Sequence, residues 1–305
     1  MSMPIGKKLD YINEPSIGPV FARFFSSGVL RELAHKGHSV TAGRLSRQYH
    51  LFEHFGTSIS VWEFYNTIFK LLVKKYRPEY IYKNAIAEKI LLGKHNLNTA
   101  FMLTEFRADN CKADAVVLNG TSHVYEIKSE VDSFDRLEDQ LNAYQKIFDY
   151  ITVVTSQNQY NLVNERIPNS VGILVLADNK YNFRKNPYRK PISNRSFVDP
   201  VVIFNSLQRT EYLEIIKKEF GISLGGIPNT QVYNEARKYF EKLAPEIAHD
   251  AMVEALKGRH NCCVADFITG VPNSLKAASL SIRLTKADGS RFIEMLHKDI
   301  STAFA

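Results

Sequence analysis

The 305-residue sequence contains only three cysteines, one tryptophan and no long uninterrupted hydrophobic segment. Cys262 and Cys263 are adjacent and Cys111 stands alone, which fits neither a disulfide framework nor a paired Cys-x-x-Cys zinc site. No segment approaches the roughly 18 apolar residues that a membrane-spanning helix needs. The first residues carry two lysines without an apolar segment after them, which argues against a secretory signal. These absences predict a cytoplasmic protein with reduced cysteines and no membrane partner.

Signatures of several enzyme classes are also absent. The sequence has no glycine-rich phosphate loop of the Walker type and no Gly-x-Ser-x-Gly nucleophile motif. Its nine histidines are scattered, and no set of His and Cys offers four ligands at zinc spacing. The sequence therefore gives no support for ATP-driven chemistry, for serine-hydrolase chemistry or for a structural zinc site.

The charge is unevenly distributed along the chain. The net charge is +7 and the pI is about 9.1. Residues 1–96 carry 14 Lys and Arg against 7 Asp and Glu, whereas residues 97–160 carry 5 against 10. An acidic centre with basic flanks is what a metal-dependent enzyme acting on a polyanion needs, because basic surfaces bind phosphates and acids bind cations. A solvated charged surface explains the same distribution equally well.

Hydrophobic periodicity divides the chain into three regions. Residues 1–80 form a helical N-terminal region, in which helical spacing over 17–78 is more typical of packing helices than of a DNA-binding helix-turn-helix. Residues 81–205 form an α/β core, and residues 206–305 form a helical C-terminal region with a linker near 221–229.

The polar loop at residues 179–197 contains no acid. Aromatic residues are interleaved with its cations, so the loop could clamp a single strand by charge and stacking, although a solvated loop is equally consistent. The cations are Lys180, Arg184, Lys185, Arg189, Lys190 and Arg195.

The α/β core is predicted to have the element order αβββαβ with a mixed central sheet. The expected elements are a helix at 81–92, strands at 99–106, 113–118 and 122–128, a helix at 135–148, and strands at 151–155 and 171–176. Asn119-Gly120 predicts a two-residue type I′ hairpin turn, because both residues tolerate positive φ.

The predicted hairpin carries the chemistry. Asp114 lies in its first strand, and Glu126 and Lys128 project from one face of its second strand, since side chains alternate. The turn brings Asp114 close enough to Glu126 for both carboxylates to share one hard cation such as Mg²⁺. Lys128 could then hold the attacking water and offset charge on a phosphate. A Glu–Lys salt bridge on an exposed strand is the simpler alternative.

The following helix adds two residues to this site. Gln140 and Tyr144 are four apart, so they share the face that points to the sheet. An inward Gln needs a hydrogen-bond partner, because an unpaired buried amide is costly. The partner could be a metal-bound phosphate, the catalytic Lys or a backbone carbonyl.

Together these elements resemble the PD-(D/E)XK nuclease superfamily, in its RecB-like branch with a Gln-x-x-x-Tyr element. Residues 125–155 are most similar to an uncharacterised group of stand-alone bacterial and phage proteins of this superfamily, and the resemblance covers residues 82–178. Ala113 departs from the pattern, which has Pro before the Asp.

The resemblance implies a restriction-endonuclease-like core and phosphodiester hydrolysis with Mg²⁺ or Mn²⁺. It makes Asp114, Glu126 and the backbone carbonyl of Ile127 metal ligands, with Lys128 orienting the water. Glu88 matches an additional upstream acid that some members use.

The expected function is a nuclease that cleaves DNA in preference to RNA, in phage defence or DNA repair. Gln140, Tyr144, Arg136 and Arg107 are the expected substrate contacts. Two alternatives remain: a catalytically silent nucleic-acid binder that keeps the fold, and a subunit that needs a protein partner or a second copy bound through its helical ends.

Overall fold

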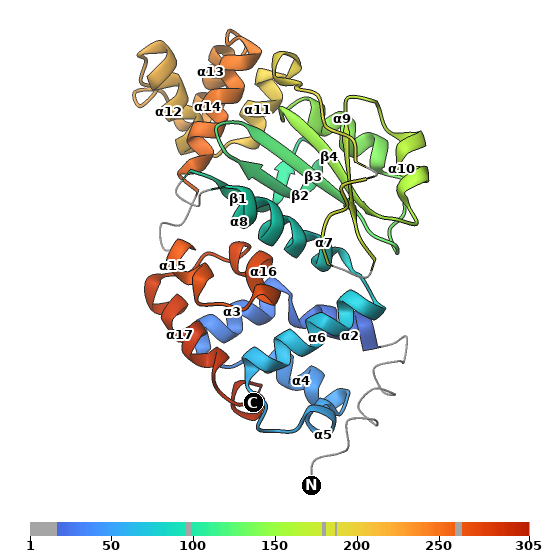
Figure 1. Cartoon of the computed structure of the whole chain (residues 1–305). Coiled ribbons are helices and arrows are strands. Elements are labelled where there is room, and N and C mark those ends of the chain that lie inside the picture. Colours follow the sequence, from blue (N-terminus) through green and yellow to red (C-terminus); the bar gives the residue numbers. More distant parts are fainter. Residues whose placement is uncertain (1–16, 96–98, 179–180, 187, 260–263, 305) are drawn as a thin grey trace.

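A computed structural model describes residues 17–95, 99–178, 181–186, 188–259 and 264–304. Its upper half contains a five-stranded sheet in the order β1-β2-β3-β4-β5 (Figure 1). Strands β1 to β3 are antiparallel, and β4 and β5 join in parallel, so the sheet is mixed. The strands are β1 Phe101–Ala108, β2 Cys111–Leu118, β3 Ser122–Lys128, β4 Tyr150–Ser156 and β5 Gly172–Leu176. The predicted α/β class with a mixed sheet flanked by helices is confirmed.

The β2–β3 turn differs from the prediction. Leu118 pairs with Ser122, so the loop has three residues instead of two. Gly120 takes a positive φ of 70°, whereas Asn119 does not. The Asn119 N–H instead donates to the carbonyl of Thr121 at 3.0 Å, which closes the loop without a left-handed asparagine.

The helix before the sheet begins earlier than predicted and is not uniform. It consists of α7 Glu79–Ala85, the π-helical segment η1 Ile86–Leu91 and the short α8 Leu92–Lys94. Pro78 is the N-cap, so the helix includes Glu79, two residues before the predicted start. Gly93 lies within α8 and does not end the helix.

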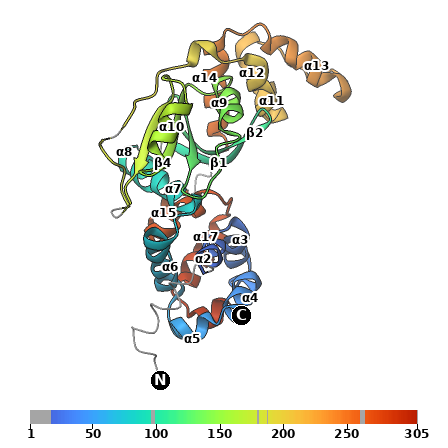
Figure 2. The ribbon, with the colours of Figure 1, turned by 90° about the vertical axis from the view of Figure 1, so that its right-hand side faces the viewer.

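Helices from both ends of the chain pack together below the sheet (Figures 1 and 2). Their buried residues, including Phe24, Phe64 and Phe292, form a core that continues onto one sheet face through Tyr125 and Ile127, and we call this the lower core. Its helices are α2 Ile17–Phe24, α3 Ser27–Lys36, α4 Val40–Gln48, α5 Leu51–Phe55, α6 Val61–Lys75, α15 Val264–Thr269, α16 Lys276–Leu280, α17 Lys286–Leu296 and α18 Ile300–Ala303.

The other sheet face is covered by a second set of helices, which form the upper core. These are α9 Leu137–Gln145, α10 Tyr160–Arg166, α11 Pro200–Ser206, α12 Arg209–Phe220, α13 Asn229–Phe240 and α14 Pro245–Lys257. The helices after residue 206 are therefore divided between two cores and do not pack as one unit.

The last part of the predicted helical C-terminal region is made of short helices. α16 ends at Leu280, and residues 286–303 are divided into α17 and α18. Thr285 starts α17 through a capping box with Asp288, and Asp299 is the N-cap of α18. The Thr285 capping box fixes the start of α17, whereas the Asp299 side chain makes no capping hydrogen bond.

The basic loop lies along the edge of β5. Arg189 exchanges backbone hydrogen bonds with Ile173, and the Arg189 side chain donates to the carbonyls of Val171 and Pro168. Tyr181 and Phe183 pack against the lower core. These three side chains are structural, so they are poorly placed to clamp a strand. Lys180 lies outside the described residues, as do Cys262 and Cys263.

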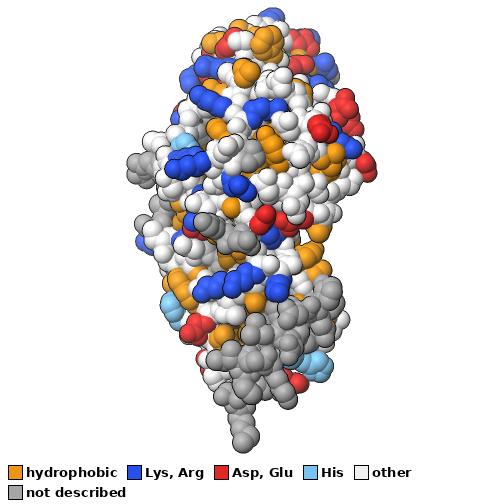
Figure 3. Space-filling model, turned by 45° about the vertical axis from the view of Figure 1, so that its right-hand side comes forward, with side chains coloured by type: hydrophobic (Ala, Val, Ile, Leu, Met, Phe, Trp, Pro, Cys, Tyr) orange, Lys and Arg blue, Asp and Glu red, His pale blue; other side chains and the backbone are white. Residues whose placement is uncertain are grey.

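The surface reflects the uneven charge of the sequence. Figure 3 shows Lys and Arg side chains above and below a group of acidic side chains at the narrow middle of the molecule. No helix in the described ranges is both long and apolar enough to cross a membrane.

Candidate metal and phosphodiester site

The site lies where the pairing of β1 and β2 is interrupted. Thr104 pairs with Ala115 and Phe106 with Ala113, but Glu105 and Asp114 between them are not paired. Glu105 has a positive φ of 54°, which a residue with a side chain rarely adopts. Because of this interruption, the side chains of Glu105 and Asp114 do not follow the regular alternation of a strand.

Asp114 is held by the neighbouring strand. Its Oδ2 accepts the backbone N–H of Ile127 at 2.8 Å, just beyond the last β2–β3 pair, Ala115 with Tyr125. The N–H and C=O of one strand residue point to the same edge, so the Ile127 carbonyl also lies on the β2 side. The predicted carbonyl ligand is therefore beside the predicted carboxylate ligand.

Three carboxylates gather at this position. One oxygen each from Glu79, Glu105 and Asp114 lies within 4.8 Å of the others. The Nζ of Lys83 is 2.7 Å from Glu79 Oε1 and 2.8 Å from Glu105 Oε1. Burial lowers the pKa of Lys83, but these carboxylates raise it more, to about 12. We call Glu79, Glu105 and Asp114 the acidic cluster.

Asp114 shows how strongly the site crowds negative charge. Burial raises its pKa, the nearby Glu126 and Glu79 raise it further, and the Ile127 N–H only partly opposes them, giving a pKa of about 8. A carboxyl in such a position is stabilised by a cation. A bound cation would lower the pKa of Asp114 further, as the charge of Lys83 already does in part.

Glu126 and Lys128 form a buried pair next to Asp114. Lys128 Nζ is 3.1 Å from Glu126 Oε1 and donates to Gln140 Oε1 at 2.9 Å. The Tyr144 hydroxyl donates to Glu126 Oε2 at 2.7 Å and lies 2.9 Å from the Lys112 carbonyl. Burial raises the pKa of Glu126, and Lys128 and Tyr144 oppose that shift. The charges are thus inside the protein, unlike those of an exposed strand salt bridge.

The structure therefore brings together five of the predicted side chains. Gln140 contacts the predicted catalytic lysine, which was one of the expected reasons for its inward position. The five are Asp114, Glu126, Lys128, Gln140 and Tyr144.

Glu88 is not in the acidic cluster. Its carboxylate forms an ion pair with Lys89 at 2.6 Å and lines a separate cavity with Lys70 and Tyr181. The acid that α7 contributes is Glu79. Sequence reasoning missed it because the predicted helix began at Ile81, and because an acid in a first helical turn is common for electrostatic reasons alone.

The two predicted arginines flank the site without joining it. Arg107 is exposed at the end of β1 opposite Lys112, and Arg136 is exposed at the N-cap of α9. The guanidinium group of neither arginine has a hydrogen bond or ion pair to another residue in the described part of the chain. Both remain available for an anionic ligand.

The donor set suits a hard divalent cation. Carboxylate and carbonyl oxygens are the ligands that Mg²⁺ and Mn²⁺ prefer, and the acidic cluster with the Ile127 carbonyl offers only oxygen. Each carboxylate oxygen has a second lone pair, so the hydrogen bonds already made by Asp114 and Glu126 do not prevent coordination.

Comparison with known proteins adds a family. Residues 73–282 match the family described as bacteriophage P4 protein cII. A curated relative, Protein cII of Enterobacteria phage P4, is 23% identical over 183 residues, which are 59% of this chain and 67% of the phage protein. No solved structure gives a significant match. The matched range contains α7 and the whole sheet, and so all the residues of the site.

Proposed function

The chain belongs to the bacteriophage P4 protein cII family, and we propose that it is a divalent-metal-dependent nuclease that hydrolyses phosphodiester bonds in DNA. The family name specifies no reaction, so the proposal depends on the site. The observation that carries it is the buried pair of Glu126 and Lys128 next to the half-buried Asp114, beside further carboxylates at an interruption of the sheet. Buried charges of this kind are costly and cluster at functional sites.

The acidic side of the site would hold the cation. Asp114, Glu79 and the Ile127 carbonyl would be its ligands, with Glu105 as the third acid of the cluster and Glu126 near Asp114. Bound Mg²⁺ or Mn²⁺ would polarise the scissile phosphate and lower the pKa of the attacking water.

Lys128 has the geometry of a water-positioning residue. Its ammonium has three donors, and in the structure two of them reach Glu126 and Gln140. The third can hold a water molecule next to the scissile phosphate and offset the charge that develops there. Tyr144 fixes the Glu126 carboxylate from the opposite side, so the lysine and the acid keep one relative orientation.

We further infer a distant relationship to the PD-(D/E)XK superfamily and its restriction-endonuclease-like core. The element order α7, β1, β2, β3, α9, β4 and the Gln140-x-x-x-Tyr144 helix beside Glu126 and Lys128 support it. A role in phage defence or DNA repair in the cytoplasm is consistent with a family named after a phage protein.

Cleavage assays test the proposal directly. Supercoiled plasmid and single-stranded DNA are incubated with wild type, Lys128→Ala or Lys112→Ala in Mg²⁺, Mn²⁺ or EDTA. We expect metal-dependent cutting by wild type and a loss of about 10²-fold or more in Lys128→Ala, because one preorganised donor is removed. Lys112 is an exposed cation on β2 whose one ion pair within the described residues is a 4.0 Å contact with the exposed Glu105, so its variant should lose little activity and controls for a change of charge near the site.

Two results would overturn the assignment. One is full activity in Lys128→Ala with an intact fold by circular dichroism. The other is no cutting by wild type under any metal, which would favour a silent nucleic-acid binder if DNA still bound, or a partner-dependent subunit if activity appeared only in a mixture.

A further inference from the structure

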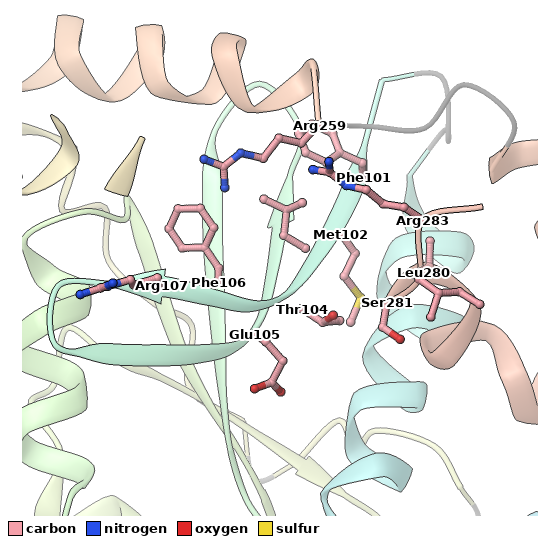
Figure 4. A pocket seen from close by; sticks show the side chains of 12 residues that line it. Phe101, Met102, Thr104, Glu105, Phe106, Arg107, Arg259, Leu280, Ser281 and Arg283 are labelled. Carbon is pink, nitrogen blue, oxygen red and sulfur yellow. The ribbon is translucent and has the colours of Figure 1, made fainter. Parts of the chain in front are cut away.

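A cavity of about 350 Å³ lies beside β1 and adjoins the acidic cluster through Glu105 (Figure 4). Three separate parts of the chain line it: residues 101–107 of β1, Arg259 after α14, and the segment 280–283 that follows α16. It therefore forms where the upper and lower helices meet at the edge strand of the sheet. Edge strands expose backbone N–H and C=O groups on one side.

The lining is cationic. It contains Arg107, Arg259 and Arg283, with Glu105 as its one acid among the lining residues. Arg259 is committed to the fold, because it forms a double ion pair with Glu211 at 2.6 and 2.7 Å and lies over a phenylalanine ring. The side chains of Arg107 and Arg283 are exposed, and neither guanidinium has a hydrogen bond or ion pair within the described ranges.

The two available arginines lie at different ends of the cavity. In Figure 4 the Arg283 side chain extends toward Phe101 and the Arg259 guanidinium lies over Phe106, whereas Arg107 lies at the far end of β1 and points away from them. Glu105 lies between these ends. Phe101 and Arg107 are six residues apart, roughly 20 Å of strand. A chain of several phosphates could contact both arginines and pass the acidic cluster on the way.

We propose that this cavity is a subsite for single-stranded nucleic acid, in which Arg283 binds the phosphate of a nucleotide next to the one that is cleaved. The inference rests on the proposed function, because it uses the acidic cluster as the cleavage position. The volume is at the lower end of small-ligand sites, which fits one nucleotide and excludes a duplex. Met102, Leu280 and Ile282 offer an apolar surface for the base and sugar.

Binding without cleavage tests the subsite. A fluorescein-labelled single-stranded oligonucleotide is titrated with wild type, Arg283→Ala, Arg283→Lys or Arg44→Ala in EDTA, and fluorescence anisotropy is recorded at several salt concentrations. We expect about tenfold weaker binding by Arg283→Ala, because a charged hydrogen bond to phosphate is lost. The slope of log K against log salt should decrease by about 0.7. Arg283→Lys keeps the charge and should lose less.

Arg44 is the matched control. It is an exposed arginine on α4, which lies in the lower part of the molecule away from β1 (Figure 1). Its removal lowers the net charge equally and should leave the affinity and the salt slope unchanged. Arg259 is not used, since removing it would leave the buried Glu211 unpaired.

The outcomes separate the subsite from the nuclease assignment. Unchanged oligonucleotide binding by a folded Arg283→Ala overturns the subsite, even if wild type cleaves DNA. A poly-glutamate peptide that competes as well as the oligonucleotide also overturns it, in favour of an acidic protein partner. If wild type never cleaves DNA but Arg283→Ala still binds the oligonucleotide about tenfold more weakly, the subsite is supported and the nuclease assignment is rejected.

Discussion

Glu79 and Glu88 lie on the same helical segment but have opposite surroundings. The Glu79 carboxylate belongs to the acidic cluster and contacts Lys83, whereas the Glu88 carboxylate pairs with Lys89 away from the cluster. If a cation binds at Asp114, only the first of these acids can contribute to its affinity. The pair therefore distinguishes the observed site from the one that the sequence suggested.

Neutralising each acid in turn should separate their roles. We expect Glu79→Gln to weaken Mn²⁺ binding by at least about tenfold, because an oxygen ligand loses its charge, and we expect Glu88→Gln to bind as wild type does. Isothermal titration calorimetry measures both without DNA. Equal losses in the two variants, or a larger loss in Glu88→Gln, would show that the cation is held elsewhere.

Asp114 should make the metal-free protein less stable as the pH rises. Its folded-state pKa of about 8 lies above the ordinary value of 3.8, so the folded protein keeps a proton that the unfolded chain releases between these values. Stability from this group is complete below the unfolded pKa and is lost as pH rises toward the folded pKa, by up to ~1.4 kcal/mol per pH unit. Added cation should reverse the loss.

Asp114→Asn removes this titrating proton and so tests the direction of the pH dependence of stability. In EDTA its Tm should exceed that of wild type by a margin that increases from pH 5 to pH 8. With Mn²⁺ the margin should shrink, since the cation stabilises only the wild-type carboxylate. Differential scanning fluorimetry at each pH gives both curves. Parallel curves would mean that Asp114 is ionised in the metal-free fold.

At the scale of strands and helices, local patterns predicted the elements that position the site. All five strands lie within two residues of their expected positions, because alternating and β-branched segments specify strands locally. The same alternation correctly placed Glu126 and Lys128 on one face, and the four-residue spacing placed Gln140 and Tyr144 on theirs. These contacts depend on geometry within one element and its neighbour.

The rest of the site depends on local irregularities of the backbone that hydrophobic periodicity does not predict. Glu105 belongs to the acidic cluster because the β1–β2 pairing is interrupted there, where Glu105 has a positive φ. Glu79 belongs to it because α7 begins directly after Pro78, earlier than predicted. The loop between β2 and β3 likewise has three residues instead of the predicted two, because the pairing of Leu118 with Ser122 sets its length. Such features arise from packing between elements, whereas hydrophobic spacing describes each element by itself.

At the scale of the whole molecule, the first helices of the chain, α2 to α6, and the last, α15 to α18, form one core. The Ser39 N–H donates to the carbonyl of Ala303 at 2.7 Å. In the same way, the Val61 N–H donates to the carbonyl of Lys298, and the Ile300 N–H donates to the carbonyl of Ile59. The Phe304 ring packs against Phe24 and Phe64. Sequence patterns identified both regions as helical but could not indicate that they pack on each other, because these contacts join residues more than 200 positions apart.

This arrangement predicts that the last turn of the chain stabilises the N-terminal helices. Phe304 is fully buried in the lower core, and replacing it with Ala should cost about 3–5 kcal/mol and lower the Tm by several degrees. Thr302→Ala, at an exposed position two residues earlier, should change the Tm little. Hydrogen exchange at moderate temperature should show the loss of protection in Phe304→Ala concentrated in α2 and α6, which the ring contacts, and not in β3 or α9. A uniform loss of exchange protection across the sheet would instead mean that the two cores unfold as one unit. The position of the segment 280–283, and with it the cavity, would then depend on the packing of the chain ends.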